Sequence, residues 1–362
     1  MKKTFLFLSI AALSMASCSS DDDSTQVEIP SVGDVLQPSV GGPNQPNQVY
    51  VDLSTGSSES INRASWDFGF SSGSEFRVII NGSLKMAVKK LETSDITLPQ
   101  TADTDVAVGG GTTLASNGYV DNPTGVLAGN GSGVGTAIAE IAATDSENKV
   151  YLVNMGFAIS TLVPSVGSVS TDGDARGWKK VRILRNGNGY EIQYADLASA
   201  TFQEKTITKN ADYNFTFFSL TSGSAVSGEP LKAKWDINFT TFTNYLTTGD
   251  GDVTYGYSDF IVTNMKGGTK AYQVLNSGGV AYENFTLASV VENNFTVSAT
   301  DQRAIGSNWR SGGGPSSLPS IRTDRFYVIK DVAGNYYKIK FLAMTNDAGV
   351  RGNPTFEYAL LQ

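Results

Sequence analysis

The residues that usually carry enzyme chemistry are scarce in this sequence. It contains no histidine and a single cysteine, Cys18, among 362 residues. Histidine is the side chain whose ordinary pKa lies closest to neutral pH, and it is the commonest ligand of transition metals. Ser-His-Asp and Cys-His catalysis and His-zinc sites are therefore excluded. A hydrolase that uses two carboxylates stays open, although spacing alone does not show two carboxyls facing one substrate.

Cys18 lies where a lipid-modified cysteine would lie. Lys2 and Lys3 precede an apolar run from Phe5 to Leu13, and small residues then lead into Cys18. This order is typical of a secretory signal, and the apolar run is shorter than the roughly 20 residues that span a bilayer. We therefore expect residues 1–18 to be a lipoprotein signal peptide and lipobox, with a lipid on Cys18. The alternative is an ordinary cleaved signal with a chance cysteine.

An acidic cluster, Asp21-Asp22-Asp23, follows the cysteine almost directly. It resembles the signal that sends lipoproteins of Bacteroidetes to the outer face of the outer membrane, so we expect a lipid anchor in that membrane and exposure at the cell surface. The alternative is a solvated acidic spacer, since runs of like charge repel one another and stay disordered.

The amino-acid composition indicates how large a core the chain can form and which classes of partner it can bind. The net charge is −8 and 40% of the residues are hydrophobic, enough apolar material for one large or two ordinary cores. The sequence shows no basic tract, so we expect no binding to nucleic acid.

The mature chain contains four methionines, Met86, Met155, Met265 and Met344. Met86, Met155 and Met344 lie in apolar or alternating runs that predict core positions. Met265 differs, because Asn264-Met265-Lys266-Gly267-Gly268 predicts a turn. A large apolar side chain in a turn must bind something or stay wet, so Met265 is a candidate ligand contact.

The elements that would position these residues are β-strands. Residues 19–46 are rich in proline and small polar residues, which predicts a flexible tether. From Val49 onward, short apolar or alternating runs are separated by Asn-Gly, Gly-Gly and Asp-Gly turns, and no long segment has helical periodicity. The pattern predicts an all-β body of antiparallel sheets. Hairpins are predicted over 75–88, 179–194 and 325–341.

Two segments of the chain resemble each other. A strand ending at Gly56 precedes Trp66-Asp67, and a similar strand ending at Gly223 precedes Trp235-Asp236. We interpret these as a tandem partial repeat, with one β-unit over 47–170 and a second over 175–362. The paired Trp-Asp motifs suggest either a ligand site or, more simply, a core tryptophan beside an aspartate that accepts loop amides.

The Trp-Asp strand and the carboxy-terminal hairpin, Asp324 to Phe341 followed by Arg351 to Tyr358, resemble the HmuY-like haem-binding lipoproteins of Bacteroidetes. The resemblance is best over about 175–362, while 47–170 is similar only to the opening part of such a domain. It implies a surface lipoprotein that captures haem and passes it to a TonB-dependent receptor. It also implies pocket positions near Tyr282 and Trp309, although both residue types more often pack in a core.

This chain departs from the family pattern at the iron ligands. The best-known member holds haem iron with two histidines, whereas the matching region here, residues 308–315, holds no iron ligand. No ligand residue is carried over. The preferred hypothesis is a non-catalytic protein that binds haem or a related hydrophobic ligand. The alternative is an adhesion or glycan-binding module with the same fold that has lost haem.

Overall fold

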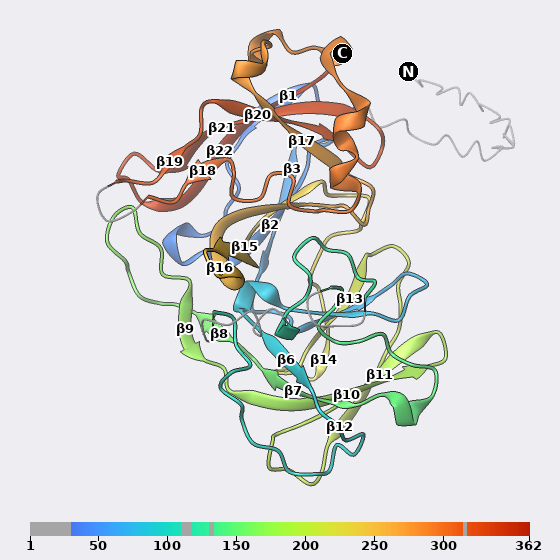
Figure 1. The fold of residues 1–362 in the computed structure, drawn as a ribbon. Helices are drawn as coiled ribbons and strands as arrows, with labels where there is room; N and C mark the ends of the chain where they lie inside the picture. The colour runs from blue at the N-terminus through green and yellow to red at the C-terminus, as the bar shows by residue number, and fades with distance from the viewer. Residues whose placement is uncertain (1–29, 110–117, 130–133, 314–316) are drawn as a thin grey trace, which may run out of the picture.

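The protein is built from antiparallel β-sheets, as the sequence predicts. The computed structural model describes residues 30–109, 118–129, 134–313 and 317–362 (Figure 1). Every strand pair among the described residues is antiparallel. The predicted signal peptide and Cys18 lie outside the described residues.

One five-stranded sheet lies in the half of the molecule drawn at the top of Figure 1, below the segment that carries the 3-10 turns after β17 (Lys270–Leu275). Its order is β1 (Gly33–Leu36), β22 (Arg351–Leu360), β21 (Tyr336–Thr345), β20 (Arg325–Lys330) and β17. The predicted hairpin over 325–341 is confirmed, since Tyr327 pairs with Ile339 and Lys330 with Tyr336. Alternate residues of β21 point into the core, because successive side chains of a strand face opposite sides.

A second five-stranded sheet closes the opposite end. Its order is β12 (Gln203–Ile207), β11 (Gly189–Ala195), β10 (Trp178–Asn186), β7 (Val150–Asn154) and β6 (Ala87–Lys90). The predicted hairpin over 179–194 is confirmed, with Asn186 paired with Gly189 across its turn.

Two four-stranded sheets lie between the ends. The first has the order β16 (Gly251–Thr263), β15 (Ile237–Thr248), β2 (Asn47–Asp52) and β3 (Ser57–Asn62). The second has the order β14 (Ser224–Val226), β13 (Phe215–Ser219), β4 (Phe68–Ser71) and β5 (Val78–Ile80).

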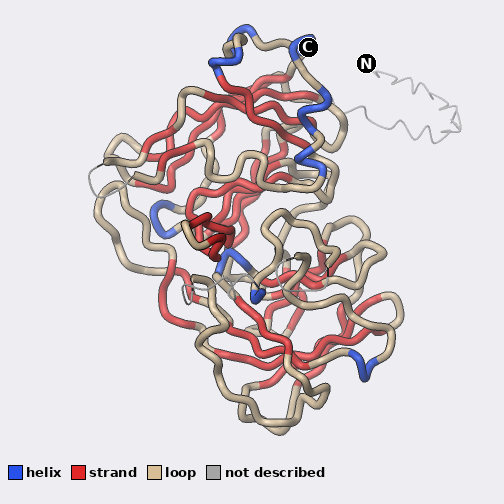
Figure 2. The backbone as a smooth tube through the Cα atoms, viewed as in Figure 1, coloured by secondary structure: helices blue, strands red, loops and turns tan. Residues whose placement is uncertain are grey.

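The remaining elements are short. Two small ladders pair β18 (Arg310–Ser311) with β19 (Ser320–Ile321) and β8 (Phe157–Ile159) with β9 (Asp172–Ala175). Brief 3-10 turns lie around the strands (Figure 2): η1 (Gly42–Asn44), η2 (Gly82–Leu84), η4 (Asp145–Glu147), η5 (Asn276–Gly278), η6 (Tyr282–Asn284), η7 (Leu287–Ser289), η8 (Glu292–Phe295) and η9 (Val297–Ala299). None of the helices in the described ranges has the length and apolar character that crossing a membrane requires.

The predicted hairpin over 75–88 is wrong. β5 pairs with β4, and β6 pairs with β7 in another sheet. Between them the Asn81 side chain accepts a hydrogen bond from the Ser83 N–H at 3.1 Å and caps η2. An Asn-Gly pair favours tight turns, but here the asparagine side chain redirects the chain from one sheet to the next.

The predicted tether ends earlier than residue 46. Residues 33–36 form β1, which pairs with β22 from Gly33–Ala359 to Leu36–Phe356. Gln45 is buried, and its Nε2 donates to the Asp259 carboxylate at 2.7 Å. The low apolar content of this segment concealed these contacts, because they are made by backbone and amide groups.

The division into two tandem units, 47–170 and 175–362, also needs correction. β2 pairs with β15, β4 with β13 and β7 with β10, so all three of these sheets contain strands from both sides of the proposed boundary. The two units therefore do not fold side by side as independent domains.

Each Trp-Asp motif is instead completed by the strand that precedes the other motif. The Asp67 carboxylate accepts the Leu220 N–H at 2.7 Å, and the Asp236 carboxylate accepts the Leu53 N–H at 2.9 Å. Trp66 packs edge-on against Phe217, with ring centroids 4.8 Å apart. We call the two aspartate contacts, Asp67 with Leu220 and Asp236 with Leu53, the strand exchange. It confirms the interpretation of both motifs as a core tryptophan beside an amide-accepting aspartate.

The same exchange holds Trp235, which packs edge-on against Tyr50 with ring centroids 5.0 Å apart. Two separate hydrophobic cores lie on either side of it, one under β10 and β11 and the other under β20, β21 and β22. The Asp67–Leu220 contact belongs to the first core, which contains Phe68 and Phe218, and the Asp236–Leu53 contact belongs to the second, which contains Leu53 and Ile237. Within each core the exchange joins segments that are distant in sequence.

We predict that Asp67→Ala strongly destabilises the protein. Asp67 is fully buried and also pairs with Arg176 at 2.6 Å. Its loss leaves the Leu220 N–H without its acceptor and the Arg176 guanidinium without its counter-charge, a class of change that costs about 3–5 kcal/mol. Chemical unfolding measures the difference.

The matched control is Asp196→Ala, which removes the exposed partner of Lys179. Exposed pairs contribute about 0–1 kcal/mol, so this variant should unfold nearly as wild type does. Equal losses in the two variants would contradict the role given to Asp67.

Candidate functional site

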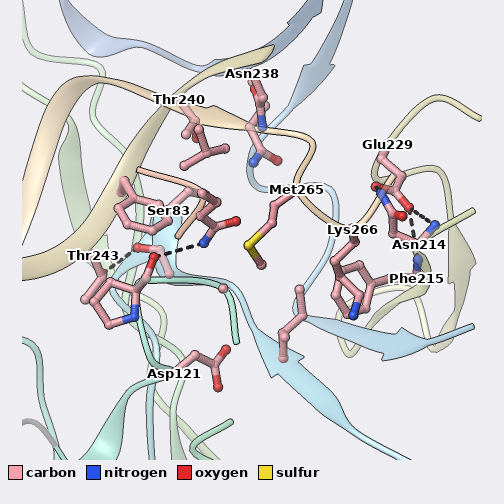
Figure 3. A pocket seen from close by; sticks show the side chains of 18 of the residues that line it. Ser83, Asp121, Asn214, Phe215, Glu229, Asn238, Thr240, Thr243, Met265 and Lys266 are labelled. Atoms are coloured by element: carbon pink, nitrogen blue, oxygen red, sulfur yellow. Dashed lines mark hydrogen bonds between the residues drawn. The ribbon is translucent and has the colours of Figure 1, made fainter. Parts of the chain in front are cut away.

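A cavity of about 170 Å³ lies where the two four-stranded sheets meet (Figure 3). It is lined from β15, from β13, from η2, from the turn after β16 and from the loop around Asp121. Figure 3 shows Ser83, Asp121, Asn238, Thr240 and Met265 placed around one space. Segments that are distant in sequence meet here because the strand exchange brings them together.

Aromatic and aliphatic side chains form most of the wall. They are Trp66, Ile79, Met86, Phe215, Phe217, Phe242 and Val262. The Trp66 ring is fixed at both edges, since it packs on Phe217 and its Nε1 donates to Gln48 Oε1 at 2.9 Å. A mostly apolar lining with a few polar groups is the usual composition of a small-molecule site.

The turn after β16 places Met265 at the cavity. The Asn264 side chain ties this turn down: its Nδ2 donates to Trp235 O at 2.8 Å and to Lys232 O at 2.7 Å. Its Oδ1 accepts the Gly267 N–H at 2.9 Å. Gly268 completes the turn at φ 111°, where a side chain would be strained. The Asn264 side chain therefore fixes the backbone of the turn, and the Met265 side chain faces the cavity.

Two carboxyls of the lining are buried and hydrogen-bonded. Glu229 accepts the Asn214 N–H at 2.7 Å and the Phe215 N–H at 2.9 Å. Asp121 accepts the Ile80 and Ala137 N–H groups, both at 2.8 Å. Burial raises the pKa of each carboxyl to about 7 in spite of these donors. Both groups are therefore substantially protonated at neutral pH.

Two other polar groups of the lining lack partners. Asn238 Oδ1 and Trp235 Nε1 are buried atoms without a hydrogen bond among the described residues. Their side chains are only 4% and 7% exposed. Buried polar groups are nearly always paired, so this acceptor and this donor mark the part of the lining that is unsatisfied.

The structure places the three predicted contact residues in different parts of the fold. Met265 lines the cavity, while Tyr282 and Trp309 do not. Tyr282 lies in η6 and packs edge-on against Phe326 at 5.7 Å. Trp309 is 1% exposed and its Nε1 donates to Asp259 O at 3.1 Å. Ligand contact by Tyr282 or Trp309 stays a prediction, and it does not concern this cavity.

The sequence does not predict Asn238, Glu229 and Asp121 as site residues, and it offers Trp235 only through the paired Trp-Asp motifs, for which a core role is the simpler interpretation. A signal existed for Asn238, because an asparagine inside the apolar strand Trp235-Asp236-Ile237-Asn238-Phe239 is unusual. Met155 and Met344 are buried as expected, and Met86 is buried at the cavity wall. Across the described ranges, no group of three or more His, Cys, Asp or Glu residues is placed to hold a metal ion.

Comparison with known proteins identifies one family. The family model described as HmuY protein matches residues 44–358. No curated protein matches.

Two solved structures were also compared. The crystal structure of a candidate HmuY-like heme binding protein from Bacteroides vulgatus is 8% identical, covers 91% of this chain and 95% of its own, and has a TM-score of 0.22. Apo PinO from Porphyromonas gingivitis is 17% identical, covers 48% of this chain and 91% of its own, and has a TM-score of 0.16. At these TM-scores neither structure adds to the assignment.

We predict that stability falls as the pH rises from about 4.5 to about 7. Burial raises the pKa of Glu229 to about 7 in the folded protein, against an ordinary value of 4.5. A carboxyl whose pKa is raised by folding contributes its full stability below the unfolded pKa and loses it as pH rises through the folded pKa. Urea unfolding across this pH range measures the slope.

In Glu229→Gln the slope should become shallower, whatever the change in absolute stability. The control, Glu92→Gln, alters an exposed carboxyl and should keep the wild-type slope. An unchanged slope in Glu229→Gln would show that Glu229 titrates normally.

Proposed function

Since this chain belongs to the HmuY family, we propose that it is a non-catalytic binding lipoprotein whose ligand site is the cavity around Met265. The observation that carries the proposal is the cavity itself: a mostly apolar space built from both central sheets, with a methionine held into it by a fixed turn. The family match supports a heme-binding type of function at the level of the family.

Haem itself does not fit the cavity as it is formed. A cavity of about 150 Å³ in another protein holds benzene, and drug-sized ligands occupy about 300–1,000 Å³. The cavity here, at about 170 Å³, is too small to enclose a porphyrin. The chain also has no histidine to ligate iron. The proposed ligand is therefore a hydrophobic molecule smaller than haem.

The alternative of a glycan-binding module gains no support from the tryptophans. All four tryptophans lie in the described ranges; Trp66, Trp235 and Trp309 are buried, and Trp178 is half-buried. A carboxylate-pair hydrolase needs one carboxyl that is acidic and one that is basic. Here burial raises the pKa of Asp121 and of Glu229 in the same direction, so their surroundings do not drive the two apart.

The location of the protein is part of the proposal. We infer from the sequence that Cys18 carries the lipid, that the lipid anchors the chain in the outer membrane, and that the body is exposed at the cell surface. β1 begins at Gly33, which leaves a short segment between Cys18 and the first strand. A TonB-dependent receptor is the partner that this location and the family suggest.

A haem titration tests the ligand proposal. We expect residues 19–362 to show no ligation-type Soret shift at micromolar haem, under oxidising or reducing conditions. Met265→Leu, which keeps the apolar volume and removes the sulfur, should give the same spectra as wild type. A saturable shift that Met265→Leu abolishes would restore haem as the ligand and overturn this account.

Metabolic labelling with palmitate tests the anchor. The wild-type chain should carry the label and fractionate with membranes, whereas Cys18→Ala should lose the label and appear in the soluble fraction. Protease treatment of intact cells should degrade the wild-type protein if its body is surface-exposed. Labelling of Cys18→Ala would contradict the assignment of the lipid to Cys18.

A further inference from the structure

The unsatisfied polar groups of the Met265 cavity define what a ligand must offer. The Asn238 side chain lines the cavity, and its Oδ1 is a buried atom that accepts no hydrogen bond from the described residues. The strand pairing fixes its position, because Asn238 is paired with Tyr50 on one side and with Val262 on the other. Leaving such a group unpaired is unfavourable. A ligand that pairs with it recovers this free energy.

A carboxamide presents an acceptor oxygen and a donor nitrogen side by side. Its best complement is another group with a donor and an acceptor at the same spacing, such as a primary amide or a lactam. Trp235 Nε1 adds one more donor at the same cavity, and it too is unpaired. Together these atoms call for a ligand with one polar edge that has at least one hydrogen-bond donor and one acceptor.

The rest of the lining limits the shape of that ligand. Trp66, Phe217 and Phe242 provide ring faces, and the volume of about 170 Å³ is close to one that encloses a single aromatic ring. Flat rings stack or pack edge-on against aromatic walls with an extra gain beyond their buried area. A single ring with a small polar edge therefore matches both the volume and the walls.

The charges around the cavity disfavour an anion. Asp121 and Glu229 line it, and both become negative as the pH rises through about 7. Lys266 is the cationic residue among the described lining residues, and its Nζ is already paired with Glu75 Oε1 at 3.2 Å. Burying an anion here would need it to displace that pair. A neutral ligand meets no such cost.

We propose that the Met265 cavity binds a neutral, single-ring aromatic molecule through a donor-acceptor edge that pairs with the Asn238 carboxamide. This inference rests on the proposed function and adds the chemical class of the ligand. It assigns Asn238 as the residue that determines specificity and Trp235 as the second donor.

Three probes of equal ring size test the proposal on residues 19–362: benzamide, toluene and benzoate. Calorimetry or ligand-observed NMR gives each affinity. Benzamide should bind about tenfold or more tightly than toluene, since one hydrogen bond that satisfies a buried group is worth about that factor. Benzoate, which keeps the shape and adds a charge, should bind more weakly than benzamide.

Variants test the preference for benzamide over toluene separately from binding in the cavity. In Asn238→Leu the preference for benzamide over toluene should disappear while toluene still binds. The variant should also be at least as stable as wild type, because it removes an unpaired buried amide. Trp235→Phe keeps the ring beside Tyr50 and should weaken benzamide more than toluene. Asn294→Leu, at an exposed asparagine, should change neither affinity.

The outcomes distinguish an error in the chemical class of the ligand from an error in the location of the binding site. If toluene and benzamide bind equally and Asn238→Leu changes neither, the ligand class is wrong while the cavity remains the site. If benzoate binds best, the requirement for a neutral ligand is wrong. If no probe binds wild type, and the cavity-filling Met265→Trp raises stability without other effect, the proposed site itself fails.

Discussion

The buried aspartates of the strand exchange are the contacts on which the rest of the structure depends. Asp67 and Asp236 are both almost completely enclosed, and each receives the backbone N–H of a strand from the opposite side of the chain. A buried carboxylate that accepts main-chain amides fixes both the position and the register of that strand. Each contact joins two segments of one core that are distant in sequence, and strands from both cores supply walls of the cavity.

The two aspartates are satisfied differently, and the difference has consequences. Asp67 has Arg176 beside it, whereas Asp236 has the Thr269 hydroxyl, which donates at 3.1 Å, and the neighbouring acids Asp52 and Asp331. Burial and those acids raise the pKa of Asp236 to about 7. One half of the exchange is therefore held by an ion pair, and the other half is held by a carboxyl that is partly protonated near neutral pH.

Much of the fold could be predicted from local sequence, but its long-range pairing could not. The hairpins at 179–194 and 325–341 followed from alternation and a turn, which are local properties. The pairing of β2 with β15 joins strands almost 200 residues apart, and the sequence of neither strand predicts which strand it pairs with. The Asn81-Gly82 pair is a second example. Its sequence favours a hairpin turn, but the Asn81 side chain donates to Trp66 O, and β5 and β6 join different sheets.

The candidate site divides in the same way. Met265 could be predicted, because a large apolar residue in a glycine-bounded turn is locally anomalous. Tyr282 and Trp309 were predicted from resemblance and lie in separate packed clusters. Asn238 and Trp235 are unsatisfied only because of what surrounds them in space, so their role became visible with the three-dimensional structure.

The pairing of β1 with β22 has a consequence for the order in which the protein is made. Gly33 lies opposite Ala359, so the first described strand can be seated only when nearly the whole polypeptide is present. During synthesis the amino-terminal segment therefore waits, without its partner, until the last strand emerges. This four-residue edge strand is therefore among the last elements of its sheet that can pair as the chain is made.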